Sequence, residues 1–163
     1  MKVAITGHSS GIGQALAKIY EQQGHLVVGL SRRNGYNIRS VPKVAAEIEP
    51  CDIFINNAQA GFAQTELLFD VWNKWQDLPK TIIVISTFMT SYPTSVLPGL
   101  DMDLYRLQKQ TLEEACHQLR GKFKPCKITV VKPGKVDDYE TWAKKLVDIL
   151  NMPGPHIPEI TLA

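Results

Sequence analysis

Short apolar runs and longer amphipathic segments alternate along the chain. The runs are brief and rich in β-branched residues, which predicts buried strands over residues 3–6, 25–30, 51–58, 81–87 and 127–134. Helical spacing of the apolar positions predicts helices over residues 12–23, 41–49, 63–77, 102–120 and 139–151. We also expect a very short strand at 36–38 and a last strand within 156–163, which Pro158 would confine to a sheet edge.

This alternation predicts the fold class. Strands that alternate with helices form a mainly parallel sheet flanked by helices on both faces. No linker or internal repeat interrupts the pattern, and 163 residues are enough for one hydrophobic core. We therefore expect a single doubly wound α/β domain of the Rossmann type spanning residues 1–163.

Composition excludes some classes of function. The net charge is only +2 and the basic residues are dispersed, so we expect no nucleic-acid partner. No segment has the ~18 continuous apolar residues of a membrane span, and the opening MKVAITG does not fit a signal peptide. We expect a soluble cytoplasmic protein without a metal site, because Cys51, Cys116 and Cys126 lack metal-type spacing and suit reduced, buried thiols.

A glycine-rich turn, TGHSSGIG at residues 6–13, joins the first predicted strand to the first helix. Such a turn lets a diphosphate approach the backbone, and the helix N-terminus attracts the anion. Gly7 would make the turn, Gly11 would permit the close approach and Gly13 would let the helix pack closely. The predicted dinucleotide contacts are Gly7, Ser9, Ser10, Gly11, Ile12 and Gly13, with the Thr6 hydroxyl as a further donor. A glycine-rich turn without a ligand is the alternative.

The residues after the second strand bear on the choice of dinucleotide. A carboxylate there would bind the adenosine ribose and repel a 2′-phosphate, but the chain has Ser31, Arg32 and Arg33. Because guanidinium groups bind phosphate and stack on adenine, we favour NADP(H) as the cofactor, with NAD(H) possible. A solvated arginine pair would leave the choice open.

Four motifs follow one another along the chain: the glycine turn, NNA at 56–58, YRLQK at 105–109 and KPG at 132–134. Together they make the chain resemble the short-chain dehydrogenase/reductase family over nearly its whole length. The resemblance implies that Asn57 ties adjacent strands together and that Ala58 passes close to a ribose. It also implies that Asn37 and Ile38 flank adenine, and that Pro133 and Gly134 border the nicotinamide. At Asp137 the chain departs from the threonine common in the family.

The YRLQK motif is the candidate acid–base pair. Tyr105 and Lys109 lie one turn apart on one helix face. A nearby ammonium would lower the pKa of the phenol, so that Tyr105 could exchange a proton with a carbonyl or alcohol oxygen. Lys109 would also bind the nicotinamide ribose. The family's third group is a hydroxyl after the fifth strand, here Thr87 or Ser86.

Other parts of the resemblance leave alternatives open. Ser91 lies further along the same segment as Ser86 and Thr87, and any of these hydroxyls could instead serve a turn or cap. Asn73 is a candidate for a proton relay, although a surface amide is favoured there.

The chain is shorter than the resemblance leads one to expect, chiefly in the region that would cover a substrate. Two functions remain: an NADP(H)-dependent oxidoreductase acting on a small carbonyl or secondary alcohol, or a non-catalytic NAD(P)-binding or redox-sensing module. We expect a homodimer through the helix at 102–120 and the helix before it, which offers Leu67, Leu68, Val71, Trp72 and Trp75. Packing within the chain is the alternative use of these residues.

Overall fold

All strands of the described chain run parallel in one sheet. The computed structural model describes residues 1–91 and 102–163. The strands are β1 (Lys2–Thr6), β2 (Leu26–Leu30), β3 (Ile53–Asn56), β4 (Thr81–Ile85), β5 (Lys127–Pro133) and β6 (Glu159–Leu162). They lie in the order β2-β1-β3-β4-β5-β6, and every neighbouring pair is parallel. The predicted α/β class is confirmed.

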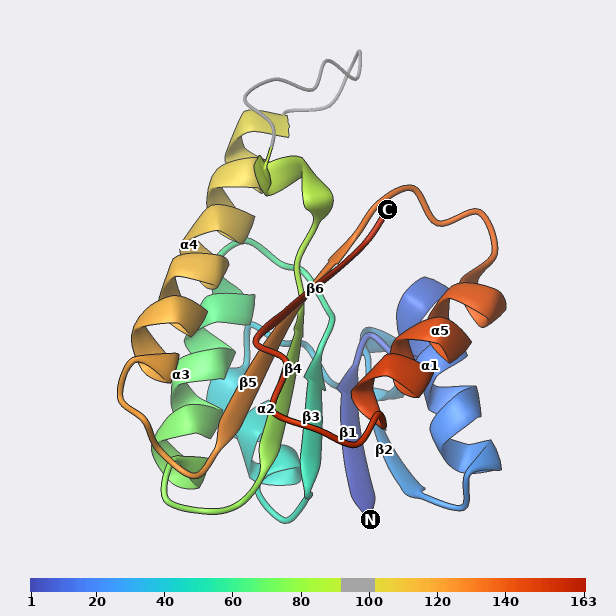
Figure 1. Ribbon diagram of the computed structural model, residues 1–163. Coiled ribbons are helices and arrows are strands. Elements are labelled where there is room, and N and C mark those ends of the chain that lie inside the picture. The colour runs from blue at the N-terminus through green and yellow to red at the C-terminus, as the bar shows by residue number, and fades with distance from the viewer. Residues whose placement is uncertain (92–101) are drawn as a thin grey trace.

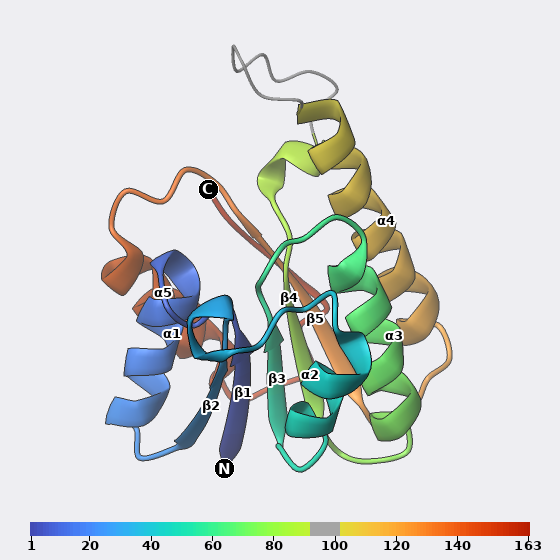
Figure 2. The same cartoon turned by 180° about the vertical axis from the view of Figure 1, so that it is seen from behind.

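Helices cover both faces of this sheet (Figures 1 and 2). One face carries α1 (Gly11–Gln22) and α5 (Tyr139–Leu150), and the other carries α2 (Val41–Ile48), α3 (Ala63–Trp75) and α4 (Met102–Arg120). Two 3₁₀ turns, η1 (Arg32–Asn34) and η2 (Phe88–Ser91), follow β2 and β4. The carboxyl ends of the strands all point to the upper edge of the sheet in Figure 1.

The central strands are mainly apolar because both sides of the sheet are buried there. Alternate residues of β1 enter different cores: Val3 and Ile5 pack with α1 and α5, whereas Ala4 packs with α2, α3 and α4. The core under α3 holds the largest side chains, with Trp72 and Trp75 almost fully buried. Two covered faces leave the carboxyl edge as the place where polar side chains converge.

The segment 36–38 does not form the predicted short strand. Asn37 instead makes a turn, in which its side-chain oxygen accepts from the Arg39 backbone N–H at 3.0 Å. The Asn37 carbonyl accepts from Ser40 at 2.9 Å, and α2 begins at the next residue. Ile38 packs into the core with α2 and α3, so the chain passes from η1 to α2 without adding a strand beyond β2.

The apolar residues of α3 expected at a dimer interface are used within the chain. Leu67, Leu68, Val71, Trp72 and Trp75 are all at most 1% exposed. The large apolar side chains that α3 and α4 do expose are Phe69, Leu104 and Leu107.

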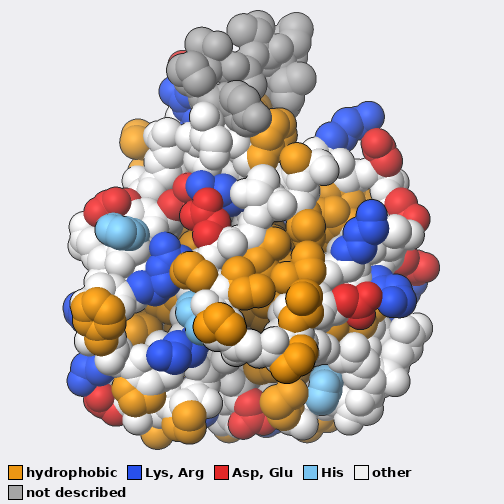
Figure 3. Space-filling view, viewed as in Figure 1, with side chains coloured by type: hydrophobic (Ala, Val, Ile, Leu, Met, Phe, Trp, Pro, Cys, Tyr) orange, Lys and Arg blue, Asp and Glu red, His pale blue; other side chains and the backbone are white. Residues whose placement is uncertain are grey.

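The last strand, β6, lies at the sheet edge directly after Pro158, as predicted. The Pro158 carbonyl accepts from the Val130 N–H at 3.0 Å and from the Arg120 guanidinium at 2.6 Å, which fixes the entry to the strand. Hydrophobic side chains gather over the middle of this face of the molecule, where β6 and α5 lie (Figure 3).

Cys51, Cys116 and Cys126 are buried free thiols, as expected. Within 1–91 and 102–163, no helix is long and apolar enough to cross a membrane.

Candidate functional site

Two pockets lie side by side along the carboxyl edge of the sheet. The larger, of about 560 Å³, lies between the glycine turn and the segment after β2. The smaller, of about 310 Å³, lies between the ends of β4 and β5 and the start of α4. Asn57 and Gln59 line both pockets, so the two form one elongated site. We call them the nucleotide pocket and the reaction pocket.

The glycine turn has the shape that a diphosphate needs. Gly7 and Gly11 have φ of +70° and +54°, where other residues are strained. A Cβ on Gly13 would lie 2.3 Å from the Gly7 carbonyl oxygen, so only glycine lets α1 pack this closely on the turn. Ser10 precedes α1 without capping it through its side chain, and the first turn of α1 has no acidic residue. The first backbone N–H groups of α1 thus remain available to an anion.

Asn57 ties β3 to β1, as the resemblance implied. Its side-chain amide donates to the Thr6 carbonyl at 3.0 Å. The Thr6 hydroxyl accepts from the backbone N–H groups of Asn57 and Ala58 at 3.0 and 3.1 Å, and donates to the Ile55 carbonyl. Thr6 is fully buried. It therefore holds the turn together and is not the phosphate donor that the sequence suggested.

Basic side chains line the end of the nucleotide pocket after β2. Arg32 and Arg33 are exposed there, and Arg33 donates to the Ser9 carbonyl at 3.5 Å. Arg39, which the sequence reasoning did not include, lines the same pocket, and none of the lining residues is acidic. Among the described residues, these three guanidinium groups form no ion pair with a carboxylate. The pocket therefore suits an anionic group.

The other predicted residues in this region have structural partners. Ser31 is buried, and Asn34 accepts from its backbone N–H at 2.8 Å and from its hydroxyl at 3.3 Å. Asn37 and Ile38 line the nucleotide pocket, although Ile38 is only 5% exposed and belongs mainly to the core.

Tyr105, Lys109 and Thr87 meet in the reaction pocket. Burial raises the pKa of the Tyr105 phenol, and a hydrogen bond with the Thr87 side chain opposes that rise. The Lys109 ammonium lies 5.8 Å from the centre of the Tyr105 ring. Burial lowers the pKa of Lys109 to about 8, against the attraction of Glu113. The predicted lowering of the phenol pKa is thus not found, because burial outweighs the hydrogen bond with Thr87.

Lys109 is held by a residue that the sequence reasoning missed. Its ammonium donates to the side-chain oxygen of Gln64 at 2.8 Å and to the Ile85 carbonyl at 2.9 Å. Gln64 lies in the first turn of α3 and is 2% exposed. Asn73, the relay candidate, is exposed near the other end of α3. The amide beside Lys109 is therefore that of Gln64.

Ser86 and Thr87 face different partners. The Ser86 hydroxyl donates to the Glu113 carboxylate, which also accepts from Thr90 at 2.8 Å. The other oxygen of Glu113 pairs with Lys132 at 3.0 Å. Of the two neighbouring hydroxyls, only that of Thr87 bonds to Tyr105. Ser91 is exposed at the end of η2.

Pro133 and Gly134 border the reaction pocket at the end of β5. A Cβ on Gly134 would lie 2.6 Å from the Cα of Ala163, so the close approach of the chain after β6 requires glycine. Asp137 forms an exposed ion pair with Lys135 at 3.0 Å and does not line this pocket. Tyr139, another residue that the sequence reasoning missed, lies 3.8 Å from the position of a Cβ on Gly11 and lines the pocket.

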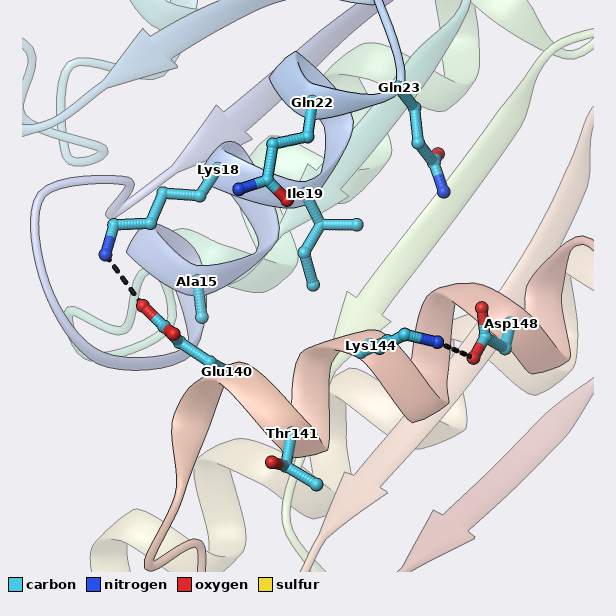
Figure 4. Close-up of a pocket in the computed structure, with 9 residues that line it drawn as sticks. All are labelled: Ala15, Lys18, Ile19, Gln22, Gln23, Glu140, Thr141, Lys144 and Asp148. Atoms are coloured by element: carbon cyan, nitrogen blue, oxygen red, sulfur yellow. Dashed lines mark hydrogen bonds and ion pairs between the residues drawn. The ribbon is translucent and has the colours of Figure 1, made fainter.

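A further pocket of about 450 Å³ lies between α1 and α5 (Figure 4). The ion pairs Lys18–Glu140 and Lys144–Asp148 lie along it, both between exposed side chains. None of the predicted site residues lines it.

Sequence similarity to known proteins is limited. No protein-family model matches the chain. A 3-ketodihydrosphingosine reductase from Bacteroides thetaiotaomicron is 33% identical over 76 residues, an alignment covering 36% of this chain and 28% of the relative. The chain thus matches less than a third of that protein's length, and the match by itself supports no activity.

Solved structures match nearly the whole chain. A short-chain dehydrogenase/reductase family oxidoreductase from Aeromonas hydrophila has a TM-score of 0.79 at 16% identity, covering 99% of this chain and 97% of its own. A 3-alpha-hydroxysteroid dehydrogenase from Pseudomonas, complexed with NADH, has a TM-score of 0.74 at 15% identity, covering 99% and 93%. An alcohol dehydrogenase from Thermococcus sibiricus, complexed with 5-hydroxy-NADP, has a TM-score of 0.73 at 15% identity, covering 99% and 95%. The chain therefore has the fold of the short-chain dehydrogenases/reductases, which its motifs led us to expect.

Proposed function

We propose that the protein is an NADP(H)-dependent oxidoreductase of the short-chain dehydrogenase/reductase type, acting on a small carbonyl or secondary alcohol. One observation carries the proposal. A single elongated site has the glycine turn and three arginines at one end, and a hydroxyl, a phenol and an ammonium at the other. The shared fold and its neighbours with bound NADH and 5-hydroxy-NADP support a nicotinamide dinucleotide as the ligand.

The residues present fit such a cofactor. The turn Gly7–Gly13 would hold the diphosphate, and Ser9, Ser10 and Ile12 of this turn would contact it. Ala58 and Asn57 would lie along the ribose, and Pro133 and Gly134 would border the nicotinamide. The three arginines suit the doubly charged 2′-phosphate of NADP(H), because several guanidinium groups without a carboxylate partner favour a dianion.

The chemistry proposed for the reaction pocket divides among three side chains. When bound, the nicotinamide supplies or accepts the hydride. Tyr105 donates its phenolic proton to the carbonyl oxygen in reduction, or takes the alcohol proton in oxidation. Thr87 donates a hydrogen bond to the same oxygen. Lys109 holds the nicotinamide ribose and, together with the bound cofactor, favours the phenolate.

Assembly and location remain predictions. We propose a cytoplasmic homodimer. The interface would use the exposed side chains of α3 and α4, among them Phe69 and Leu107, because the residues first expected there are buried in the core.

The test begins with binding. We expect NADPH to raise the melting temperature more than NADH does. A panel of small carbonyls should then identify turnover that falls at least ~100-fold in Tyr105→Phe, since a positioned acid contributes about 10²–10⁴-fold. Tyr20→Phe is the matched control: it removes the hydroxyl of a buried tyrosine on α1, outside the proposed site, and should keep full turnover.

Three results would separate the alternatives. Unchanged turnover in Tyr105→Phe would refute the assigned acid. Binding of NADPH without turnover of any carbonyl would favour a non-catalytic dinucleotide-binding or redox-sensing module. If neither nucleotide raised the melting temperature, both functions would fail.

A further inference from the structure

Several hydrogen bonds hold the side chain of Gln64 near the reaction pocket. Its amide nitrogen donates to the carbonyls of Asn56 at 2.7 Å and Ile85 at 3.1 Å. Its own backbone carbonyl accepts from the Asn56 side chain at 2.9 Å. These bonds join the first turn of α3 to the ends of β3 and β4, and Gln64 is 2% exposed.

The bonding leaves one orientation for the Gln64 carboxamide. A flipped group would turn its oxygen toward two carbonyl oxygens and its NH₂ toward the Lys109 ammonium, so every contact would become repulsive. The oxygen therefore faces Lys109, at 2.8 Å from its nitrogen. Because this side chain is buried and held on its other side, it fixes where the ammonium lies.

We propose that Gln64 is the positioning residue of the site: its carboxamide oxygen, together with the Ile85 carbonyl, holds the ammonium of Lys109 beneath Tyr105 in the reaction pocket. An ammonium has three N–H donors. Within residues 1–91 and 102–163, Gln64 and Ile85 take two of them, which leaves one for a ligand in the pocket. The catalytic value of this arrangement rests on the proposed function, whereas the physical link between Gln64 and Lys109 does not.

Among the residues that the structure describes, few charged or titratable groups surround Lys109. Tyr105 and Glu113 lie on α4, one turn before it and one turn after. Glu113 is paired with Lys132 of β5. From α3 and β4 the contacts are the neutral Gln64 and Ile85 carbonyls. Loss of the Lys109 proton should therefore change the chemical shift of the Gln64 side-chain amide directly.

The first test uses the unaltered protein and nuclear magnetic resonance. The side-chain amide signal of Gln64, assigned in the unaltered protein by its through-space contacts with Asn56 and Ile85, should shift with pH at the same midpoint as the Lys109 Cε signal. That midpoint is expected near a pKa of about 8. The amide of Gln118, which bonds to Glu114 on the exposed face of α4, is the control and should show no step there. If the Gln64 amide signal did not shift at the pH where Lys109 loses its proton, the proposal would be overturned.

The second test uses two matched variants, Gln64→Met and Gln118→Met. Losing the bond to Gln64 should lower the Lys109 midpoint by roughly one unit, because a hydrogen bond to the charged form favours it. It should also weaken NADPH binding at least ~3-fold while leaving 2′,5′-ADP binding unchanged, since that ligand lacks the nicotinamide half. Gln118→Met should change none of these.

An unchanged Lys109 midpoint in Gln64→Met would overturn the proposal even if NADPH still bound. A shared transition in a protein that binds no nicotinamide dinucleotide would refute the proposed function and leave the positioning intact. Should Gln64→Met fail to fold, the measurement on the unaltered protein decides alone.

Discussion

Replacing Thr6 with valine should destabilise the protein by an amount that the structure allows us to work out. The Thr6 hydroxyl accepts from the backbone N–H groups of Asn57 and Ala58 at 3.0 and 3.1 Å. Valine has nearly the same shape but no oxygen, so both N–H groups would lose their acceptor. Each buried donor left without a partner costs about 1–3 kcal/mol. Because Asn57 and Ala58 are themselves partly exposed, water would offset some of this, and we expect about 2–3 kcal/mol in total.

Urea unfolding followed by tryptophan fluorescence would measure this loss, since Trp72 and Trp75 are buried in the core. With a slope of about 2 kcal/mol per M, the midpoint should fall by about 1–1.5 M. The melting temperature should fall by about 4–12 °C. Thr111→Val is the matched control: its hydroxyl only bonds back to the Leu107 carbonyl on an exposed helix face, so the change should stay within about 0.5 kcal/mol.

Equal losses in Thr6→Val and Thr111→Val would refute the reasoning. They would mean that the loop after β3 finds other acceptors for its N–H groups and that the Thr6 hydroxyl does not organise the turn. A slope that changed together with the midpoint would instead point to an altered unfolded state, so the comparison is valid only at constant slope.

Further predictions concern the two ends of the site. Thr87→Val should lower turnover at least ~10-fold, whereas Ser86→Ala should lower stability more than turnover, as paired kinetic and urea measurements would reveal. Arg39→Ala should weaken NADPH at least ~10-fold and NADH little, measured by fluorescence titration; an equal loss for both would contradict a role toward the 2′-phosphate. Burial lowers the folded-state pKa of Lys109 to about 8, below its ordinary value, so between pH 8 and 10 the unfolded chain binds more protons and stability should rise with pH. The unfolding free energy of the unaltered protein minus that of Lys109→Met should therefore increase from pH 8 to pH 10. A difference that does not change with pH would contradict the lowered pKa of Lys109.

Patterns local in sequence predicted the scaffold well. The apolar runs identified the strands, because a parallel strand buried on both faces has no polar alternation to obscure it. The turn between β1 and α1 was recognisable because Gly7 and Gly11 adopt positive φ and Gly13 touches the Gly7 carbonyl, which only glycine allows. The short strand at 36–38 was wrong because Asn37 satisfies the backbone through its own side chain instead.

Contacts between distant residues were not predictable from these patterns. Gln64 and Lys109 are 45 positions apart, and nothing near Gln64 in the sequence marks it as different from other amides of a helix. At Asn73 the surface amide that the sequence favoured is confirmed, since Asn73 is exposed near the far end of α3. Arg39 lines the nucleotide pocket, and it follows directly on the turn at Asn37, where the sequence had predicted a strand.

The choice between Ser86 and Thr87 shows how a distant charge can set the roles of neighbouring residues. Both hydroxyls follow β4, both are less than a tenth exposed, and the sequence favoured neither decisively. Glu113 decides between them, because one carboxylate oxygen accepts from Ser86 and Thr90 while the other pairs with Lys132. Burial works against the charge on Lys132, yet hydrogen bonds and attraction from Glu113 and Glu159 raise its pKa, so Lys132 keeps its charge beside the Glu113 carboxylate that also accepts from Ser86. Because Ser86 bonds to Glu113, Thr87 is the hydroxyl that remains for Tyr105. The proposed acid–base chemistry therefore depends indirectly on the Glu113 carboxylate, which acts through Ser86.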